Sequence, residues 1–436
     1  MTPELPRSPL HAWIAARIGA PDTQLCAALA AHQLARLQET LHLARTRSPF
    51  YRRRLAGAPQ VLASLQDLAS FPFTTAQDIR DFGLQFLCVS QDEIQRVVTL
   101  DTTGTTGRPK CIYFTRDDQE LTVDFFRAGM ATLTGPGDRV LILLPGDRPG
   151  SVGDLLATAL TRLGAMPLKH GLVRDPAETL AVMRSEQVDC LVGVPAQVLA
   201  LATCGAELTL KSVLLTTDHV PDAIVRKVEA AWGCTVYNHY GMTEMGLGGG
   251  VECAARRGYH LREADLLFEV IDPVTGVPAP EGTPGEVVFT TLTRRGMPLI
   301  RYRTGDVSHF VPDPCPCEAA LRTLARVRHR ADGAVCIGDG TFTMADLDEA
   351  LFALPGVLNF SASVDHAARD ILTLEVNVTG GPSSAGAREV AAALEAIRDI
   401  AAARALGQLD VAINVRQTGY ILSGPAKRTI VSRPGF

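Results

Sequence analysis

The stretch Thr102-Thr103-Gly104-Thr105-Thr106-Gly107-Arg108-Pro109-Lys110 decides how the rest of the chain is interpreted. It lies between two apolar runs, residues 96–100 and 111–115, and both have the composition of a β-strand. Glycines let backbone N–H groups approach an anion closely, threonine hydroxyls add donors, and Lys110 adds positive charge. The stretch therefore predicts a loop that holds the phosphates of a nucleotide, and an exposed polar hairpin is the alternative.

This loop differs from the Walker A loop. That motif needs a glycine, four residues and then Gly-Lys-Ser/Thr at the start of a helix. Here the lysine follows Arg108-Pro109 and leads into a predicted strand. The loop therefore predicts phosphate binding without the P-loop fold.

Length and composition favour a large cytoplasmic protein. The 436 residues favour two or three domains, and 46% hydrophobic with 20% charged residues can bury a large core. A net charge of −5 argues against a general nucleic-acid binder. No apolar run reaches the roughly 18 residues of a membrane span, and the first residues lack the apolar core of a signal peptide. We therefore expect no nucleic-acid or membrane partner and mostly reduced cysteines.

The patterning predicts an α/β (α+β) fold. Residues 22–45 have helical spacing, Ser48 is expected to start a shorter helix, and Thr74 or Thr75 to cap another that runs to Asp81. Between residues 96 and about 241, apolar strands alternate with helices, which predicts mostly parallel sheets covered by helices.

The remaining residues predict two further parts. Residues 266–310 carry strands separated by Pro/Gly turns, which predicts an antiparallel β subdomain. A linker at 331–333 precedes a small α+β unit with a helix near 387–404. We expect a large N-terminal domain, residues 1–330, and a small C-terminal domain, residues 331–436.

Polar residues follow two predicted strands at the edge where parallel sheets bind ligands. One group is Thr216-Thr217-Asp218, and the other begins at Asn238, after a strand at 235–237. The residues that we expect beside a ligand are Thr217, Asp218, Asn238, His239, Tyr240, Gly241 and Met242.

Three more motifs carry chemistry. In Tyr240-Gly241-Met242-Thr243-Glu244 the ring can stack on a purine, Thr243 can donate to a phosphate and Glu244 can hold Mg²⁺. Asp306, in Arg301-Tyr302-Arg303-Thr304-Gly305-Asp306, can accept both hydroxyls of a ribose. Lys427 follows Gly424-Pro425-Ala426 on a flexible tail. Each alone is better explained by core packing or a solvated turn, but four motifs in this order are not.

Together the motifs resemble those of the adenylate-forming superfamily of acyl-CoA synthetases, adenylation domains and luciferases. The phenylacetate–CoA ligase branch is more similar, because it also typically carries segments like Ser48-Pro49-Phe50-Tyr51 and Phe71-Pro72-Phe73-Thr74-Thr75 before the phosphate loop. The resemblance covers nearly the whole chain. It implies an ATP-dependent carboxylate–CoA ligase that forms an acyl-adenylate from an aryl or arylacetic acid, releases pyrophosphate, and then makes an acyl-CoA thioester and AMP.

The resemblance also implies residue roles. The phosphate loop would be Thr102, Thr103, Gly104, Thr105, Thr106, Gly107 and Lys110. Asn238 and Tyr240 look like adenine contacts, Thr243 an α-phosphate contact and Glu244 the Mg²⁺ ligand. Asp306 looks like the ribose ligand, with Arg330 nearby, and Lys427 looks like the lysine of the adenylation step. The C-terminal domain would then be a mobile lid that rotates about a hinge at Asp332.

Two departures from the family pattern matter. The hinge motif is usually Gly-Arg-X-Asp-Asp, whereas this chain has His329-Arg330-Ala331-Asp332-Gly333. The lysine motif often reads Ser-Gly-Lys, whereas here Pro425-Ala426 separates Gly424 from Lys427, so Arg428 competes with Lys427 for the role.

A structural zinc site is a separate prediction. Three thiols and an imidazole form a tetrahedral zinc set, and similar patterns occur in phenylacetate–CoA ligase-like sequences. The candidate ligands are Cys253, His260, Cys315 and Cys317. Four unrelated reduced side chains are the alternative, and the other cysteines are better explained by core packing.

The acceptor and the acid stay open. The expected cofactors and substrates are ATP, Mg²⁺, coenzyme A and a small carboxylic acid, and His219 or His239 would contact the carboxylate. Gly248-Gly249-Gly250 would let a ligand approach the backbone. A carrier-protein thiol or an amine could replace CoA as the acyl acceptor. A nucleotide-binding protein without turnover is a further alternative. The oligomeric state, which includes a homodimer, is left undetermined.

Overall fold

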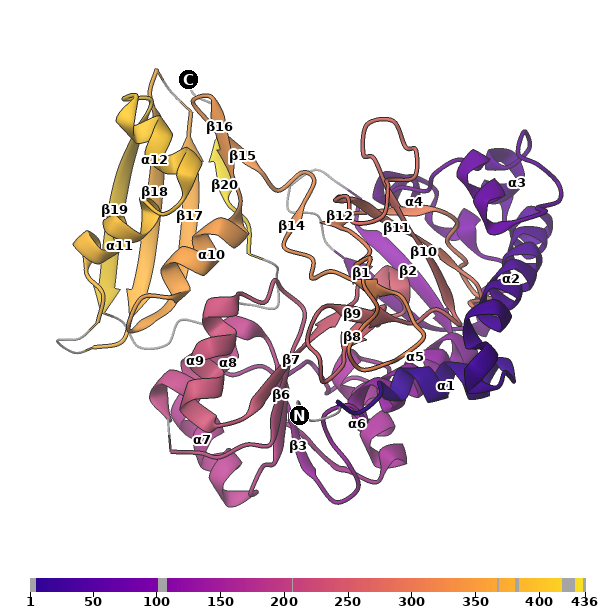
Figure 1. Ribbon diagram of the computed structural model, residues 1–436, viewed down its shortest axis with the longest axis horizontal. Coiled ribbons are helices and arrows are strands. Elements are labelled where there is room, and N and C mark those ends of the chain that lie inside the picture. Colours follow the sequence, from indigo (N-terminus) through magenta and orange to yellow (C-terminus); the bar gives the residue numbers. More distant parts are fainter. Residues whose placement is uncertain are drawn as a thin grey trace. The chain divides into compact units, whose positions relative to one another are not determined.

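The computed structural model describes residues 5–100, 108–205, 207–366, 368–380, 384–417 and 428–433 (Figure 1). The chain divides into two compact units. The first unit comprises Met1–Thr132, Arg148–Gly164 and Asn238–Val327. The second unit comprises Leu133–Asp147, Ala165–Tyr237 and Arg328–Phe436.

Helices begin the first unit, as the patterning predicts. They are α1 (Pro9–Ile18), α2 (Leu25–Arg47), α3 (Pro49–Arg54), α4 (Ala76–Phe82), α5 (Arg116–Met130) and α6 (Val152–Leu163). The Ser48 hydroxyl accepts from the Tyr51 N–H at 3.2 Å and starts α3. Thr75 accepts from the Asp78 N–H at 3.1 Å, and the Asp78 carboxylate accepts from the Thr75 N–H. This reciprocal cap confirms Thr75 as the residue that starts α4.

Antiparallel strands make up the sheets of the first unit. Strands β1 (Ile94–Leu100) and β2 (Lys110–Thr115) pair on either side of the predicted phosphate loop. Strands β10 (Leu266–Ile271), β11 (Gly285–Thr291) and β12 (Tyr302–Ser308) form the predicted antiparallel part. Strand β8 (Gly250–Glu252) pairs with β9 (Tyr259–Leu261), which pairs with β13 (Thr323–Leu324). Residues Asn238–Tyr240, the end of β7 (Thr235–Tyr240), pair with β8.

One strand boundary differs from the sequence prediction, and a second is set by a backbone torsion angle. Pairing with β8 extends β7 through Tyr240, so residues 238–240 lie within the strand and not after it. Strand β12 begins at Tyr302, because Arg301 has a φ of 47° and cannot continue an extended strand. Burial then alternates along β12, with Tyr302, Thr304 and Asp306 on its buried side.

A parallel sheet forms the middle of the second unit. Strands β4 (Met166–Lys169), β3 (Arg139–Ile142), β5 (Cys190–Gly193) and β6 (Ser212–Leu215) pair in that order, all parallel. Helices α7 (Pro176–Ser185), α8 (Pro195–Cys204) and α9 (Asp222–Trp232) connect and follow them. The continuous apolar strands are buried, as expected for a parallel sheet covered by helices.

The end of the chain forms the predicted α+β part of the second unit. Its elements are β15 (Val335–Ile337), β16 (Gly340–Phe342), α10 (Met344–Phe352), β17 (Val357–Asp365), β18 (Asp370–Val378), α11 (Ala387–Leu394), α12 (Arg398–Ala405), β19 (Leu409–Gln417) and β20 (Val431–Arg433). The sheet order is β19-β18-β17-β20. The single helix expected near residues 387–404 is two helices, and Ile397 at the break packs against the core.

Each unit holds one of the two tryptophans of the chain. In the first unit, the Trp13 indole N–H donates to Asp124 at 2.9 Å. In the second, Trp232 ends α9, is 1% exposed and donates its indole N–H to the Gly205 carbonyl at 3.0 Å. Each ring therefore reports on the core of its own unit.

Across the part of the chain that the structure describes, every helix is too short or too polar to cross a bilayer.

Candidate active site

A buried carboxylate, Glu244, is the centre of the site in the first unit. It lies in a short 3₁₀ turn, Thr243–Met245, directly after β7, and is 3% exposed. Its Oε1 accepts from Lys110 Nζ in an ion pair and from the Tyr302 hydroxyl at 2.9 Å. Lys110 Nζ also lies 3.5 Å from the Tyr302 hydroxyl. The first residue of β2, beside the predicted phosphate loop, thus meets the predicted magnesium ligand.

Glu244 is held in its ionised form. Burial opposes ionisation, but the charge of Lys110 and hydrogen bonds from Lys110 and Tyr302 keep the pKa of Glu244 below its ordinary value. An ionised carboxylate with little exposure can bind a divalent cation, because Mg²⁺ takes carboxylate oxygens. The donor set therefore fits a magnesium ligand, provided that Lys110 shares or leaves the carboxylate.

The backbone around Glu244 is fixed from a distance in sequence. Arg294 Nη1 donates to the Glu244 carbonyl at 2.8 Å, and Arg294 Nη2 donates to the Tyr113 carbonyl at 2.9 Å. The Asp118 carboxylate accepts from the Arg295 and Gly296 N–H groups at 3.0 and 3.2 Å. Because Asp118 also accepts from the N–H of Thr115, the N-cap of α5, the helix start positions the loop that carries Arg294.

Tyr240 and Asp306, predicted to bind adenine and ribose, are directly hydrogen-bonded. The Tyr240 hydroxyl donates to Asp306 Oδ2 at 2.9 Å, and both side chains are buried. Burial and the nearby Asp306 charge raise the pKa of Tyr240 well above its ordinary value, so the hydroxyl stays protonated as a donor. One face of the Tyr240 ring stacks on Tyr259, with ring centroids 5.5 Å apart. The structure thus joins Tyr240 and Asp306 by a direct hydrogen bond within the first unit.

Protein side chains occupy the space expected for a ligand at the glycine run. A Cβ on Gly248 would clash with the Phe125 ring, and one on Gly249 would lie 2.7 Å from the Met245 sulfur. Glycine at these two positions therefore leaves room for the Phe125 side chain of α5 and the Met245 side chain of the turn that carries Glu244. Gly241 is similarly constrained, because a Cβ there would clash with the Leu247 carbonyl.

His239 faces aromatic side chains. Its ring centroid lies 6.3 Å from that of Phe125 and 6.2 Å from that of Phe126. Burial lowers the pKa of His239 to about 4. Its imidazole is therefore neutral at pH 7.

Asn238 lies on the same strand as His239. It is buried, and its backbone N–H donates to Glu252 at 2.9 Å. This bond connects the predicted adenine contact to β8.

Three predicted nucleotide contacts belong to the second unit. Thr217 has a φ of 76°, which is unusual for a β-branched residue, and is exposed. Asp218 pairs with Arg428, with Nε and Oδ2 3.6 Å apart. Arg330 donates from Nε to Asp332 at 3.2 Å, so the predicted hinge residue is a partner of the predicted ribose-side arginine.

Several predicted residues lie outside the described part of the chain. They are Thr102, Thr103, Gly104, Thr105, Thr106, Gly107 and Lys427. Their roles stay predictions.

The four predicted zinc ligands converge in the first unit. Their ligand atoms all lie within 4.8 Å of one another, and all four residues are buried. The Sγ atoms of Cys253 and Cys315 are 3.5 Å apart, and His260 Nε2 lies 3.1 Å from Cys317 Sγ. Zn–S bonds of about 2.3 Å in a tetrahedron place two sulfurs about 3.8 Å apart, so the spacing fits zinc.

Without a cation, the protonation of this cluster suits a metal at Cys317 only, because zinc also needs a neutral His260 and an ionised Cys253. Hydrogen bonds from Cys253 and His260 outweigh burial and lower the pKa of Cys317 to about 3. Although burial opposes protonation, hydrogen bonds with Cys315 and Cys317 raise the pKa of His260 to about 9. The hydrogen bond to Cys317 and burial raise the pKa of Cys253. One thiolate is therefore already favoured before a cation binds.

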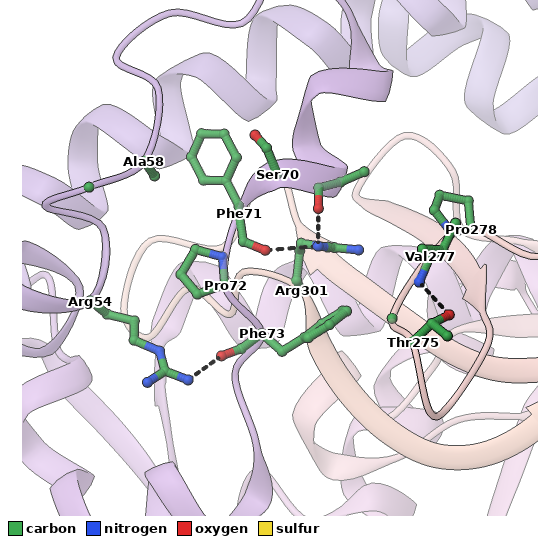
Figure 2. Close-up of a pocket in the computed structure, with 13 residues that line it drawn as sticks. Arg54, Ala58, Ser70, Phe71, Pro72, Phe73, Thr275, Val277, Pro278 and Arg301 are labelled. Atoms are coloured by element: carbon green, nitrogen blue, oxygen red, sulfur yellow. Dashed lines mark hydrogen bonds between the residues drawn. The ribbon is translucent and has the colours of Figure 1, made fainter.

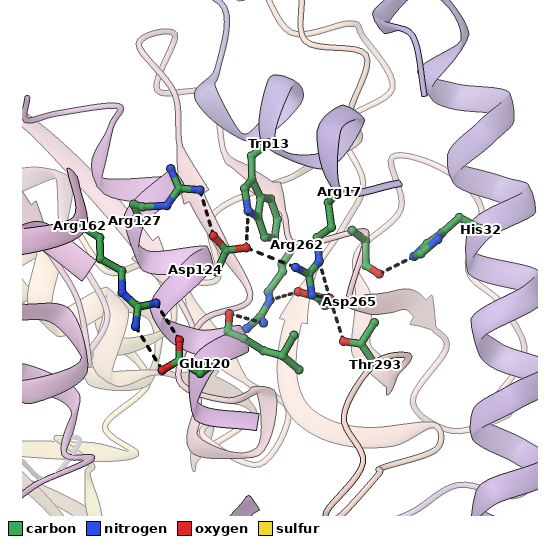
Figure 3. Close-up of polar contacts among 12 residues, drawn as sticks. Trp13, Arg17, His32, Glu120, Asp124, Arg127, Arg162, Arg262, Asp265 and Thr293 are labelled. Carbon is green, nitrogen blue, oxygen red and sulfur yellow. Dashed lines mark hydrogen bonds and ion pairs between the residues drawn. The ribbon is translucent and has the colours of Figure 1, made fainter. Parts of the chain in front are cut away.

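A network of charges ties α1 to the rest of the first unit (Figure 3). Arg17 donates to Asp265 at 2.9 Å and pairs with Asp124 at 3.3 Å. Arg262 donates to Asp265 at 2.7 Å and to the Leu121 carbonyl at 2.6 Å. The N-terminal helix thus contacts both α5 and the turn before β10. The sequence carries no local signal for this network, because its members are up to 248 residues apart.

Figure 2 shows a cavity of about 590 Å³ whose lining does not include Glu244. Its lining includes Arg54, Phe73, Val277 and Arg301. Arg301 is fully engaged there, because it pairs with Glu269 at 3.0 Å and donates to two carbonyls. Its charge is already compensated by the protein.

Sequence reasoning assigned no role to Tyr302 or Arg294. Tyr302 could have been found, because residues 302, 304 and 306 share one side of a strand, and Asp306 was already a candidate. Arg294 gave no such signal, since its partners Glu244 and Tyr113 are 50 and 181 residues away.

Lys110, the ionised buried Glu244 and the buried Tyr240–Asp306 pair all lie in the first unit, at positions that the sequence motifs single out. Residues 67–292 match the family model described as AMP-binding enzyme, which is more than half of the chain. The chain therefore belongs to the family of AMP-binding enzymes, and the expected family and fold class are confirmed.

Two relatives and a solved structure are similar to most of this chain. The chain is 32% identical over 349 residues to the phenylacetate-coenzyme A ligase of Thermus thermophilus, which is 76% of each chain. It is 30% identical over 331 residues to that of Pseudomonas putida, 72% of this chain and 74% of the relative. A solved 2-hydroxyisobutyryl-CoA ligase in the postadenylation state has a TM-score of 0.78 at 24% identity, covering 95% of this chain and 90% of its own. This last likeness supports the fold.

Proposed function

We propose that the chain is an ATP-dependent carboxylate–CoA ligase that activates an aryl or arylacetic acid. The observation that carries the proposal is Glu244, ionised in a buried position between Lys110 and Tyr302. Membership of the AMP-binding family and similarity to phenylacetate-coenzyme A ligases support it. The reaction has two halves: acyl-adenylate formation with release of pyrophosphate, then attack by the CoA thiol with release of AMP.

The first half needs positive charge more than covalent help. A carboxylate and a triphosphate are both anionic, so their approach is unfavourable without countercharge where charge develops. Mg²⁺ on Glu244 would supply that countercharge when bound, and Thr243 would donate to the α-phosphate. Lys110 is the last residue of the predicted phosphate loop and supplies a further cation. Lys427 is our candidate for the cation of the adenylation step.

Lys110 has two competing partners in this scheme. In the structure its ammonium neutralises Glu244. A divalent cation on the same carboxylate would repel the ammonium. We therefore expect Lys110 to move from Glu244 to a phosphate oxygen when the metal–nucleotide complex binds, which keeps both charges compensated.

The ribose would be held by Asp306. Its Oδ2 already accepts from Tyr240, and the strand places it on the same side of β12 as Tyr302. Two carboxylate oxygens can accept several hydrogen bonds. We infer that Tyr240 orients Asp306 and presents its ring to adenine on the side away from Tyr259.

We also propose a structural zinc ion at Cys253, His260, Cys315 and Cys317. Its support is the convergence of three thiols and one imidazole in a buried cluster. The ion would join the loop with Cys315 and Cys317 to the β8–β9 hairpin. Because β8 pairs with Tyr240, such a clip would stabilise the strand that carries the adenine contact.

The proposal is tested first by acid-dependent ATP–pyrophosphate exchange. Aryl, arylacetic and fatty acids are compared, and the products formed with CoA are then identified by mass spectrometry. Exchange with one class of aromatic acid and a matching acyl-CoA are the expected results. Exchange without an acyl-CoA would replace CoA by a carrier-protein thiol or an amine. ATP binding without exchange for any acid would contradict a ligase.

A further inference from the structure

Arg428 is clamped between two aromatic rings in the second unit. Its guanidinium carbon lies 4.7 Å from the centroid of Phe352, on α10, and 5.0 Å from that of Phe360, on β17. The side chain is 11% exposed. Guanidinium groups over aromatic faces are attracted by the ring quadrupole. The residue is thereby fixed to the α+β part of the unit.

Two carboxylates from different segments reach the same guanidinium. Asp348, on α10, accepts from Arg428 Nη2 at 2.5 Å and is 1% exposed. Asp218 Oδ2 lies 3.6 Å from Arg428 Nε. Asp218 follows β6 and comes directly after Thr217 with its positive φ. Arg428 therefore joins a strained loop at the end of a parallel strand to α10.

This arrangement is poorly suited to stability alone. Arg428 Nη1 and Asp348 Oδ2 are buried without a hydrogen-bond partner among the described residues. A buried ion pair gains little over well-packed apolar residues of the same volume, and two phenylalanines would pack well around a methionine. Packing alone therefore does not account for a charge at this position, and its carboxylate partners are the groups that would use it.

A second set of contacts joins the same two segments. The Glu349 carboxylate accepts from the backbone N–H groups of Asp222 and Ala223 at 2.6 and 3.1 Å, at the start of α9. Lys227 Nζ donates to the Leu354 carbonyl at 2.6 Å. Residues 218–227 thus hold α10 and its C-terminal end at several polar points.

We propose that Arg428 is a positioning residue for the first half-reaction, with Phe352, Phe360 and Asp348 as its permanent holders and Asp218 as a partner used only during adenylation. This inference rests on the proposed ligase function. The predicted hinge, Asp332, lies between Asp218 and Arg428 in sequence, whereas Asp348, Phe352, Phe360 and Arg428 all follow it. A rotation about the hinge would break the pair with Asp218 and keep the clamp intact.

The assignment also separates Arg428 from Lys427. An arginine held by two rings and a buried carboxylate is not available to a nucleotide. Arg428 would instead fix the chain one peptide bond after the candidate lysine. As a positioning residue it would hold α10 and residue 428 to the loop after β6 through Asp348 and Asp218.

The test compares the two half-reactions in Asp218→Asn and Arg428→Met. Phenylacetate-dependent ATP–pyrophosphate exchange reports adenylation, and phenylacetyl-CoA formation from supplied phenylacetyl-adenylate reports the second half. We expect exchange to fall about tenfold in both variants and thioester formation to stay within about twofold in Arg428→Met. Arg369→Met, which removes an exposed pair with Asp410 in the same part of the chain, is the control. Equal loss of both halves, or loss of neither, in Arg428→Met would overturn the proposal.

Hydrogen–deuterium exchange tests the contacts of Arg428 with Asp218 and Asp348 without an activity assay. Asp218→Asn should speed exchange in α10 but not in residues 428–433, whereas Arg428→Met should speed it in both. Arg428→Lys keeps the charge but loses the planar fork, so it serves if the methionine variant does not fold. Unchanged exchange in α10 of Asp218→Asn would overturn the inference. An inactive wild-type protein would refute the ligase function, but hydrogen–deuterium exchange would still decide whether Asp218 holds α10 through Arg428.

Discussion

Burial of the Glu244 carboxylate costs stability but places a negative charge where the proposed function needs one. Its carboxylate is buried, and the Lys110 ammonium, the Tyr302 hydroxyl and its own backbone N–H keep it ionised. A buried charge that loses its partner is strongly destabilising. The stability of the site is therefore linked to the same pair that we assign to phosphate and magnesium binding.

Lys110→Met tests this link. It leaves a buried carboxylate with one hydroxyl donor, and we expect a loss of about 3 kcal/mol in the free energy of unfolding. Adding Glu244→Gln removes the charge and should recover most of that loss, while pyrophosphate exchange stays abolished. Urea unfolding of the wild type, both single variants and the double variant measures the effect. A double variant no more stable than Lys110→Met would contradict the pairing.

His239 predicts how stability depends on pH. Burial lowers its pKa to about 4 in the folded protein, against about 6.5 in an unfolded chain. The unfolded state then binds more protons below pH 6.5, so this contribution to stability is present at pH 7 and lost as the pH falls towards 4. The loss at pH 5 is about 2 kcal/mol.

The matched variant is His239→Phe, whose ring can pack against Phe125 and Phe126 and does not titrate. Urea unfolding at pH 7 and pH 5 gives the difference for each protein. We expect a smaller difference in the variant, and an identical pH dependence in both would contradict the assignment.

At the scale of elements, the glycine run shows what local patterns leave undetermined. Gly248 can be recognised as a position of close approach, but the approaching group is the Phe125 ring from α5, more than 120 residues earlier. Gly248→Ala should destabilise the protein by about 1–3 kcal/mol through overpacking. Gly57→Ala, where a Cβ meets nothing within 4 Å, is the control. Equal thermal stability of the two variants would argue against the contact.

The β8–β9 hairpin and the loop with Cys315 and Cys317 lead to a metal prediction. Protein purified without chelator should contain about one zinc per chain, and Cys317→Ser should lose it and melt at a lower temperature. Cys336→Ser, at an exposed cysteine, should keep both the metal and the stability. Plasma mass spectrometry gives the metal content. Metal-free wild-type protein would contradict the site.

Other elements were predictable because their signals are local. The strands beside the phosphate loop, the start of α4 at Thr75 and the parallel strands β3, β5 and β6 follow from composition, capping and apolar runs. The extension of β7 to Tyr240 depends on pairing with β8, and the break between α11 and α12 on packing of Ile397. Tertiary contacts decided those boundaries.

For the whole molecule, the predicted domains 1–330 and 331–436 remain a prediction. The contact division instead groups Arg328–Phe436 with Leu133–Asp147 and Ala165–Tyr237. The network of Arg17, Asp124 and Asp265 could not be predicted, because oppositely charged residues are common and the sequence does not say which of them meet. The convergence of Cys253, His260, Cys315 and Cys317 could be predicted, because only a few residue types bind zinc, and the zinc ion itself stays a prediction.

Lys427 provides the prediction that concerns the whole catalytic cycle. Lys427→Ala should lower pyrophosphate exchange at least a hundredfold, because a cation is lost where charge develops. Thioester formation from supplied adenylate should persist. Lys211→Ala, which removes an exposed pair with Asp138, is the control. Equal loss of both half-reactions would contradict the role.

The placement of one tryptophan in each unit makes the chain its own spectroscopic reporter. Trp13 and Trp232 are the only indoles, and each donates its N–H inside its own unit. Trp232→Phe leaves a fluorophore in the first unit, and Trp13→Phe leaves one in the second. Emission from these two variants would therefore show whether the two halves of the molecule melt together, and which of them a nucleotide protects.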